Sequence, residues 1–147
     1  MLPESIELII VTPERQLLRE TVMEVTLPGA GGCLGILPGH APLITELGIG
    51  ELTYRAKSAS DVRHLAIISG FAEVLGDRVT VLAETAERPE EIDVARAEEA
   101  KKRAEERLTS AANDPNVDWG RAAVALQRSL IRIQVARKRR GAPVSSS

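Results

Sequence analysis

Two pairs of arginines stand at helical spacing in the second half of the chain. Arg96 and Arg103 lie two helical turns apart. Arg128 and Arg132 lie one turn apart, so the members of each pair point to one side of their helix. If the two helices close with both pairs on the same side, four guanidinium groups converge and repel one another unless an anion joins them. A triphosphate is a suitable anion, so the spacing indicates a candidate anion-binding site.

The same arginines have a simpler interpretation as members of surface ion pairs. The acidic partners would be Glu98, Glu99, Glu105 and Glu106. Exposed ion pairs of this kind contribute little to stability. Residues 121–140 also carry seven Lys and Arg and no acidic residue, which is typical of a solvated basic face. Nucleic-acid binding is disfavoured, because no aromatic residue that could stack on a base follows Trp119.

Side chains for nucleophilic or metal chemistry are few. His40 and His64 are the only imidazoles, and nothing in the sequence pairs either of them with Cys33 or Ser69. We expect His40 to hydrogen-bond its own turn and His64 to lie at the start of a strand. One cysteine and two isolated histidines cannot supply a zinc ligand set. The sequence therefore indicates neither a catalytic residue nor a metal site.

The first half of the chain is organised around residues 29–43, which read GAGGCLGILPGHAPL. Five glycines and two prolines exclude a regular helix and predict a shaped loop. Its apolar side chains must pack against a sheet or meet a partner. The segment is not a dinucleotide fingerprint, because Leu34 stands where a glycine is needed. It is not a phosphate loop either, because Gly-Lys-Ser/Thr occurs nowhere in the chain.

The residues around this segment predict β structure. The run Ile6–Thr12 is apolar and rich in β-branched residues, as in a buried strand. Further short strands are expected at 16–20, 22–27, 43–47, 50–56, 63–69, 71–75 and 77–84, with breaks at 48–50, 57–61, Gly70 and 76–77. Eight short strands with no helical period between them predict an antiparallel sandwich or flattened barrel over residues 1–88.

The periodicity changes after Pro89. Residues 93–110 lack Gly and Pro, and Asp93 is a suitable N-cap; Asp118 caps a second helix from Trp119 to about residue 139. The expected apolar stripes are Ala97, Ala100, Ala104 and Leu108 on the first helix and Ala122, Leu126, Leu130 and Ile133 on the second. The fold class is thus α+β, with an antiparallel hairpin at 89–140 and a disordered tail at 141–147. A hairpin with so little apolar area must dock elsewhere, which makes it a candidate switch.

Several motifs together resemble one family. The segment 32–43 resembles the signature loop of the epsilon subunit of bacterial F-type ATP synthase. The similarity extends to DRVTVLAETA at 77–86, to IDVARA at 92–97 and to the two helices joined near 113–118. One departure is Cys33, where many members carry glutamate.

The resemblance implies a non-catalytic subunit of the central stalk of the rotor, with no required cofactor. Its expected partners are the gamma subunit and the ring of c subunits, with alpha and beta subunits as further contacts, and its hairpin would regulate ATP hydrolysis. It would lie at the cytoplasmic side of the bacterial inner membrane, held there through partners. The residues expected to face the c ring are Gly32, Cys33, Gly35, Pro38, Gly39 and His40.

The resemblance also implies a regulatory ligand. IDVARA is similar to the Ile/Leu-Asp-x-x-Arg-Ala motif that nucleotide-binding epsilon subunits carry at the start of their first helix. The residues so implied for ATP are Glu87, Ile92, Asp93, Arg96, Ala97, Arg103, Arg128 and Arg132. Glu87 and the backbone of 92–93 would accept hydrogen bonds from the adenine amino group.

Composition alone leaves a second function open. The net charge of −2 combines −5 over residues 1–86 with +3 over residues 87–147. The single cysteine excludes an internal disulfide, the first residues lack the pattern of a signal peptide, and no apolar run approaches the roughly 18 residues that span a bilayer. A free-standing nucleotide- or nucleic-acid-binding module is the alternative function.

Overall fold

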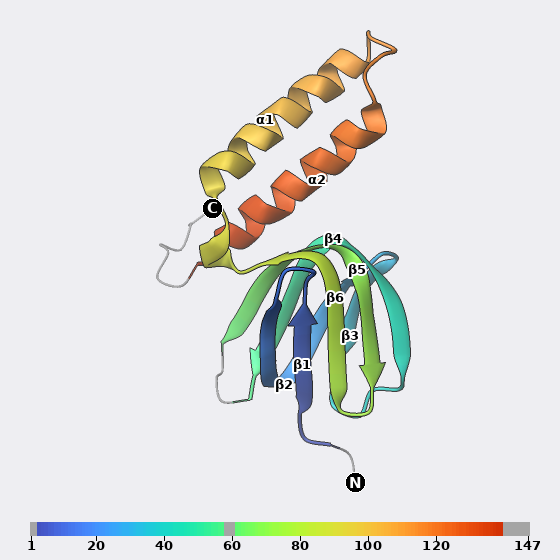
Figure 1. The fold of residues 1–147 in the computed structure, drawn as a ribbon, viewed down its shortest axis with the longest axis vertical. Coiled ribbons are helices and arrows are strands. Elements are labelled where there is room, and N and C mark those ends of the chain that lie inside the picture. Colours follow the sequence, from blue (N-terminus) through green and yellow to red (C-terminus); the bar gives the residue numbers. More distant parts are fainter. Residues whose placement is uncertain (1–2, 58–60, 140–147) are drawn as a thin grey trace. The chain divides into compact units, whose positions relative to one another are not determined.

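The computed structural model describes residues 3–57 and 61–139. The chain divides into two compact units, Met1–Glu87 and Arg88–Ser147. The first unit is all-β and the second contains two helices (Figure 1). The predicted succession of a β domain and a helical hairpin is confirmed. The predicted tail at 141–147 and the centre of the predicted loop at 57–61 lie outside the described residues.

One sheet makes up the first unit. Its strands are β1 (Ile6–Val11), β2 (Gln16–Gly29), β3 (Gly32–Ile36), β4 (Leu43–Ala56), β5 (Val62–Leu75) and β6 (Arg78–Glu87). The order is β1-β6-β5-β4-β2-β3, and an additional pairing of β1 with β2 closes the sheet into a flattened barrel. β1 and β6 pair in parallel, so the expectation of a wholly antiparallel sheet is wrong at this pair. A closed ring of five strands cannot alternate in direction all the way round.

The prediction of eight short strands is also wrong. The gap expected at Thr21 lies inside β2, the break at 48–50 inside β4 and the break at Gly70 inside β5. The ladder between β4 and β5 continues past the glycines, with Leu47 opposite Gly70 and Ile49 opposite Ile68. Ser69 has φ of 57° and Gly70 has φ of 137°. These two residues bend β5 without ending it. Of the β5 residues, the odd-numbered Leu65 and Ile67 belong to the barrel core before the bend, and the even-numbered Ala72 and Val74 after it.

The glycine-rich segment differs from the expected loop as well. Residues 32–36 form β3, an edge strand that pairs with β2 from Val25 opposite Ile36 to Gly29 opposite Gly32. Ile36 turns into the core and Leu34 is half-buried against it. Within 29–43, the turn at 30–31 and the connection at 37–42 are the parts without strand structure. Pairing with β2 overrides the low strand propensity of glycine, because the two inward apolar side chains fix the register.

The barrel core is aliphatic. Its fully buried side chains include Leu8, Ile10, Val22, Leu27, Leu52, Leu65, Ile67 and Val81. Burying each such side chain is worth about 1.5–3 kcal/mol, so the core can be stable with very few aromatic residues. Tyr54 is the only aromatic residue buried among the described core residues.

The second unit contains η1 (Pro89–Glu91), α1 (Val94–Ala111) and α2 (Trp119–Ala136). Both predicted caps are confirmed: Asp93 accepts from the Arg96 amide and Asp118 from the Arg121 amide, each at 3.1 Å. The two helices pack against each other as an antiparallel hairpin (Figure 1). Neither of the described helices is long and apolar enough to cross a membrane.

The prediction is wrong for one residue of the apolar stripe on α2. Leu130 is 44% exposed, and Ser129 is buried in its place. The Ser129 hydroxyl donates to the Ala125 carbonyl at 2.6 Å, so its polar atom is satisfied within the helix. Small residues face one another across the hairpin, with Ala97 and Ala104 buried on α1. A serine can therefore occupy the contact, whereas leucine at that position would push the helices apart.

Candidate anion site and docking surfaces

The arginines of the hairpin share one relation to the buried stripe. Arg96, Arg103, Arg128 and Arg132 directly precede Ala97, Ala104, Ser129 and Ile133, all of which are buried. In an α-helix each residue is turned by about 100° from the next, so each arginine flanks the helix contact by the same offset. In an antiparallel pair, equal offsets of the same sense fall on the same side. The structure therefore brings both predicted pairs to one side of the hairpin.

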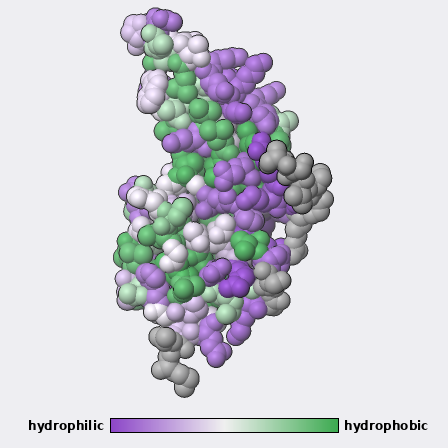
Figure 2. All heavy atoms as spheres, turned by 180° about the vertical axis from the view of Figure 1, so that it is seen from behind, coloured by the Kyte–Doolittle hydropathy of each residue, from purple (hydrophilic) through white to green (hydrophobic). Residues whose placement is uncertain are grey.

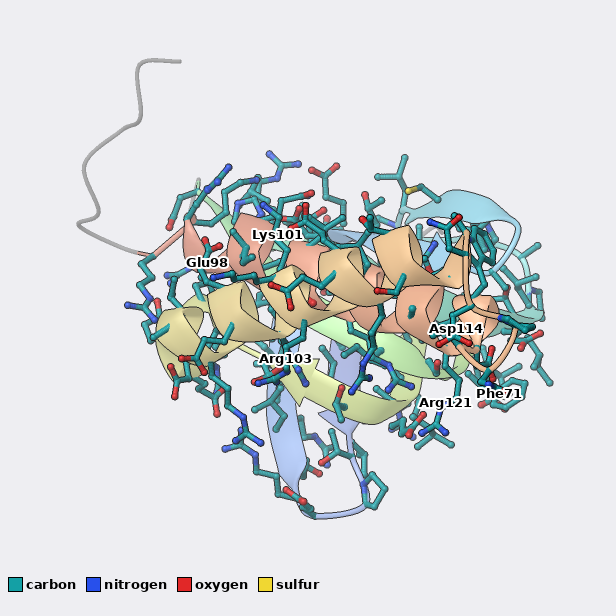
Figure 3. The ribbon with its side chains drawn as sticks, turned by 90° about the horizontal axis from the view of Figure 1, so that it is seen from above. Phe71, Glu98, Lys101, Arg103, Asp114 and Arg121 are labelled. Atoms are coloured by element: carbon teal, nitrogen blue, oxygen red, sulfur yellow. The ribbon has the colours of Figure 1, made fainter. Side chains whose placement is uncertain are left out.

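Two further arginines follow the same rule and were missed in the sequence. Arg121 precedes the buried Ala122, and Arg107 precedes the half-buried Leu108. Figure 3 shows Arg103 and Arg121 on one side of the hairpin, and Glu98 and Lys101 on the other. The signal that could have found them is the arginine that immediately precedes five residues of the predicted apolar stripes, namely Ala97, Ala104, Leu108, Ala122 and Ile133.

The competing interpretation, surface ion pairs with glutamates, lacks support at three of the four arginines in the part of the chain that the structure describes. There, no ion pair joins Arg96, Arg103 or Arg128 to an acidic side chain. These three arginines are exposed, whereas Arg132 is half-buried and already interacts within the chain. Uncompensated like charges on one flank favour an incoming anion.

The residues predicted to hold the adenine are arranged differently. Glu87 is the last residue of β6 and belongs to the first compact unit. The Asp93 carboxylate caps α1, and Ala97 is buried against α2. The Ile92 carbonyl accepts a hydrogen bond from the Arg139 guanidinium, so an adenine amino group would have to displace that donor. The phosphate side of the predicted site is therefore more open than the adenine side.

The residues predicted to face the c ring occupy two consecutive elements. Gly32, Cys33 and Gly35 lie in the edge strand β3 and are exposed. Pro38, Gly39 and His40 lie in the turn that follows. The His40 amide donates to the Leu37 carbonyl at 3.1 Å, and its ring Nδ1 lies 2.7 Å from the Ala41 carbonyl. The expectation that His40 hydrogen-bonds its own turn is confirmed.

The other histidine lies on the outside of the barrel. His64 is the third residue of β5, and its Nδ1 lies 2.5 Å from a carboxylate oxygen of Glu51 on β4. The pair joins neighbouring strands. No group of His, Cys, Asp and Glu in the described residues could hold a metal ion.

An apolar patch on the outer face of the barrel was missed in the sequence. Ile44 is 73% exposed, Phe71 56% and Leu82 55%. They come from β4, β5 and β6, and Phe71 is directly opposite Leu82 in the ladder. With Ala72, Glu73 and Thr80 they line a shallow depression of about 280 Å³. Adjacent exposed apolar side chains of this size mark a contact surface for another protein.

The hairpin also carries exposed apolar side chains. Trp119 is 64% exposed and Leu130 44%, and both lie on α2. Figure 2 shows a hydrophobic strip on the hairpin bordered by hydrophilic side chains. The fold and these surfaces define a class of protein: a small β-barrel with an apolar contact face, joined to a helical hairpin with an arginine-lined side.

Matches to known proteins cover nearly the whole chain. The β-sandwich domain of the ATP synthase delta/epsilon chain matches residues 5–89, and the long alpha-helix domain of that chain matches residues 90–137. The ATP synthase epsilon chain of Solibacter usitatus is 46% identical over 138 residues, which cover 94% of this chain and 100% of that one. The ATP synthase epsilon chain of Koribacter versatilis is 58% identical over 105 residues, 71% of this chain and 72% of that one.

A solved structure shows the same fold. A chain of the Euglena gracilis mitochondrial ATP synthase, in a structure of OSCP, F1 and c-ring, has a TM-score of 0.78 and 25% identity, covering 92% of this chain and 83% of that one. This chain belongs to the ATP synthase delta/epsilon family. It is an epsilon-type, non-catalytic component of the central stalk, as the sequence predicts. Because both domains match this family, we set aside the alternative of a free-standing nucleotide- or nucleic-acid-binding module.

Proposed function

We propose that this chain links the gamma subunit to the ring of c subunits in the rotor of a bacterial ATP synthase, and that its hairpin regulates ATP hydrolysis. The observation that carries the proposal is the pair of exposed surfaces on the barrel, the apolar patch and the β3 edge with its turn. A subunit that bridges two partners needs two such surfaces. The chain would reach the cytoplasmic side of the inner membrane only through these partners.

We assign the apolar patch to gamma. Its centre is Phe71 with Ile44 and Leu82, and Glu46 and Glu73 are their exposed neighbours across the ladder. An apolar centre with a charged rim is the usual composition of a protein interface. The acidic rim favours a gamma surface with basic side chains around its own apolar centre.

We assign the β3 edge and the turn at 37–42 to the c ring. β3 is the last strand of the sheet order, so one side of it carries backbone groups without a strand partner. Cys33 and Gly39 are exposed, and Leu37 is 59% exposed. Short polar loops of a ring can hydrogen-bond to such backbone groups, and Leu37 offers an apolar contact beside them.

The arginine side of the hairpin is the proposed site for the phosphates of ATP. Arg96 and Arg103 would approach them from α1, and Arg128 and Arg132 from α2. Guanidinium groups bind phosphate oxygens through paired, charge-assisted hydrogen bonds. Nucleotide bound across both helices would hold the hairpin in its compact form.

Isothermal titration of the full chain with ATP tests this site. The parent should release heat at millimolar ATP or below. An Arg128→Ala, Arg132→Ala double variant should bind at least about 100-fold more weakly, since it loses two hydrogen bonds from charged groups, each worth about 1.5–3 kcal/mol. The control is Lys101→Ala with Arg137→Ala, which removes two cations outside the arginine side. Absence of heat in the parent, or equal weakening in the two double variants, removes the proposed site.

ATP hydrolysis by the reconstituted complex tests regulation. We expect the rate of ATP hydrolysis to rise several-fold when residues 89–147 are deleted, because the hairpin that restrains hydrolysis is lost. The barrel and its two surfaces remain. A variant lacking only residues 140–147 serves as the control and should behave as the full chain. An unchanged rate after loss of the whole hairpin would contradict a regulatory role in this enzyme.

A further inference from the structure

The Arg139 side chain joins the two ends of the hairpin unit. The Arg139 Nε donates to the Pro89 carbonyl at 3.0 Å, and one terminal nitrogen donates to the Ile92 carbonyl at 2.5 Å. Pro89 lies in η1 and Ile92 immediately precedes the cap of α1. Arg139 itself follows the last turn of α2. Positions 50 and 47 residues apart are thus connected by one guanidinium group.

The geometry uses what is particular to arginine. Its planar fork presents several N–H donors in a fixed arrangement, and here two of them meet two carbonyls of the same turn. Pro89 and Ile92 are both buried, and Ile92 is only 2% exposed. The Pro89 carbonyl also accepts a hydrogen bond from the Ile92 amide at 3.4 Å, so loss of Arg139 falls mainly on the Ile92 carbonyl. Leaving the carbonyl of a buried residue without its donor costs more than the bond itself contributes, so the contact resists breaking.

We propose that Arg139 is a latch that holds the hairpin compact in the absence of any ligand. The contact between α1 and α2 supports this role. It consists largely of alanine and serine and buries little apolar area, so by itself it stabilises the hairpin only weakly. The latch closes the end of the hairpin opposite the 112–118 connection. With both ends tied, α2 cannot separate from α1 until the two hydrogen bonds of Arg139 break. The proposal does not depend on nucleotide binding.

The sequence around the latch provides a matched control. Arg137 is an exposed cation two residues earlier, and its contribution to the helix end is made by its backbone amide, which donates to the Ile133 carbonyl. Replacing Arg137 removes the same charge from the same helix terminus. Any effect that belongs to charge near the C-terminus of α2, rather than to the latch, appears in both variants.

Hydrogen exchange of the full chain, without nucleotide, tests the latch. In Arg139→Ala the amides of α1 and α2 should exchange about tenfold faster than in the parent, while those of the barrel strands keep their rates. Arg139→Lys, which retains the charge and loses the fork, should give most of this acceleration, and Arg137→Ala should give little. Equal exchange in Arg139→Ala and the parent, or equal acceleration in Arg137→Ala, overturns the proposal.

Discussion

Gly70→Ala should destabilise the barrel by roughly 3–5 kcal/mol, a large share of the roughly 5–15 kcal/mol by which an ordinary domain is stable. Gly70 has φ of 137°, a conformation that alanine rarely adopts. A Cβ placed there would lie 2.1 Å from the Leu82 carbonyl oxygen and 2.8 Å from the Ala83 Cα. These atoms belong to the backbone of β6 and cannot rotate away. Either the β5–β6 ladder opens at the bend or the strand straightens and loses its change of buried face.

Urea unfolding followed by circular dichroism measures this loss. The matched control is Gly35→Ala, since no atom lies within 4 Å of a Cβ built at Gly35 and its φ is ordinary. That variant should remain within about 1 kcal/mol of the parent. A Gly70→Ala protein as stable as the Gly35→Ala protein would show that the bend of β5 does not require glycine.

Phe71→Glu should weaken binding to gamma about 100-fold and leave the fold intact. The side chain is 56% exposed at the centre of the apolar patch, so the folded chain loses little, whereas a complex would bury an unpaired carboxylate. Binding of the purified chain to a gamma subunit, measured at equilibrium, gives the ratio. The control is Val62→Glu, which places the same charge at a 43% exposed apolar residue at the start of β5. Equal loss in the two variants would remove the assignment of the patch.

Cross-linking in the assembled complex separates the two surfaces. In a Cys33→Ser background, a cysteine replacing Phe71 should react with gamma, and one replacing His40 should react with the c ring. Phe71 lies in β5 and His40 in the turn after β3, so the two probes report on different elements. Links from His40 to gamma alone would mean that the barrel is oriented differently on the rotor.

The helical hairpin could be predicted almost completely from the sequence. Its signals are local: Asp93 and Asp118 as caps, the break at 113–116, and the absence of Gly and Pro between Val94 and Ala111. Helical hydrogen bonds join residues four apart, so neighbours along the chain decide the element. The arginine side follows for the same reason, because the offset of each arginine from the buried stripe is fixed by helical geometry alone.

The barrel depended on contacts that are distant in sequence. A glycine that ends a strand and a glycine that bends one look alike locally, and Gly70 bends β5 because its partners Leu47 and Ala83 keep the ladder intact. The apolar patch was hidden for the same reason, since the bend changes which residues of β5 face outward, and Phe71 becomes exposed beside Ile44 and Leu82. The parallel pairing of β1 with β6 follows from closing a ring of five strands, and ring closure is a property of the whole sheet.

The sequence by itself determined the elements that local hydrogen bonds and caps define, together with the family. Strand pairing and the face each strand buries were decided by tertiary structure, because both depend on partners tens of residues away.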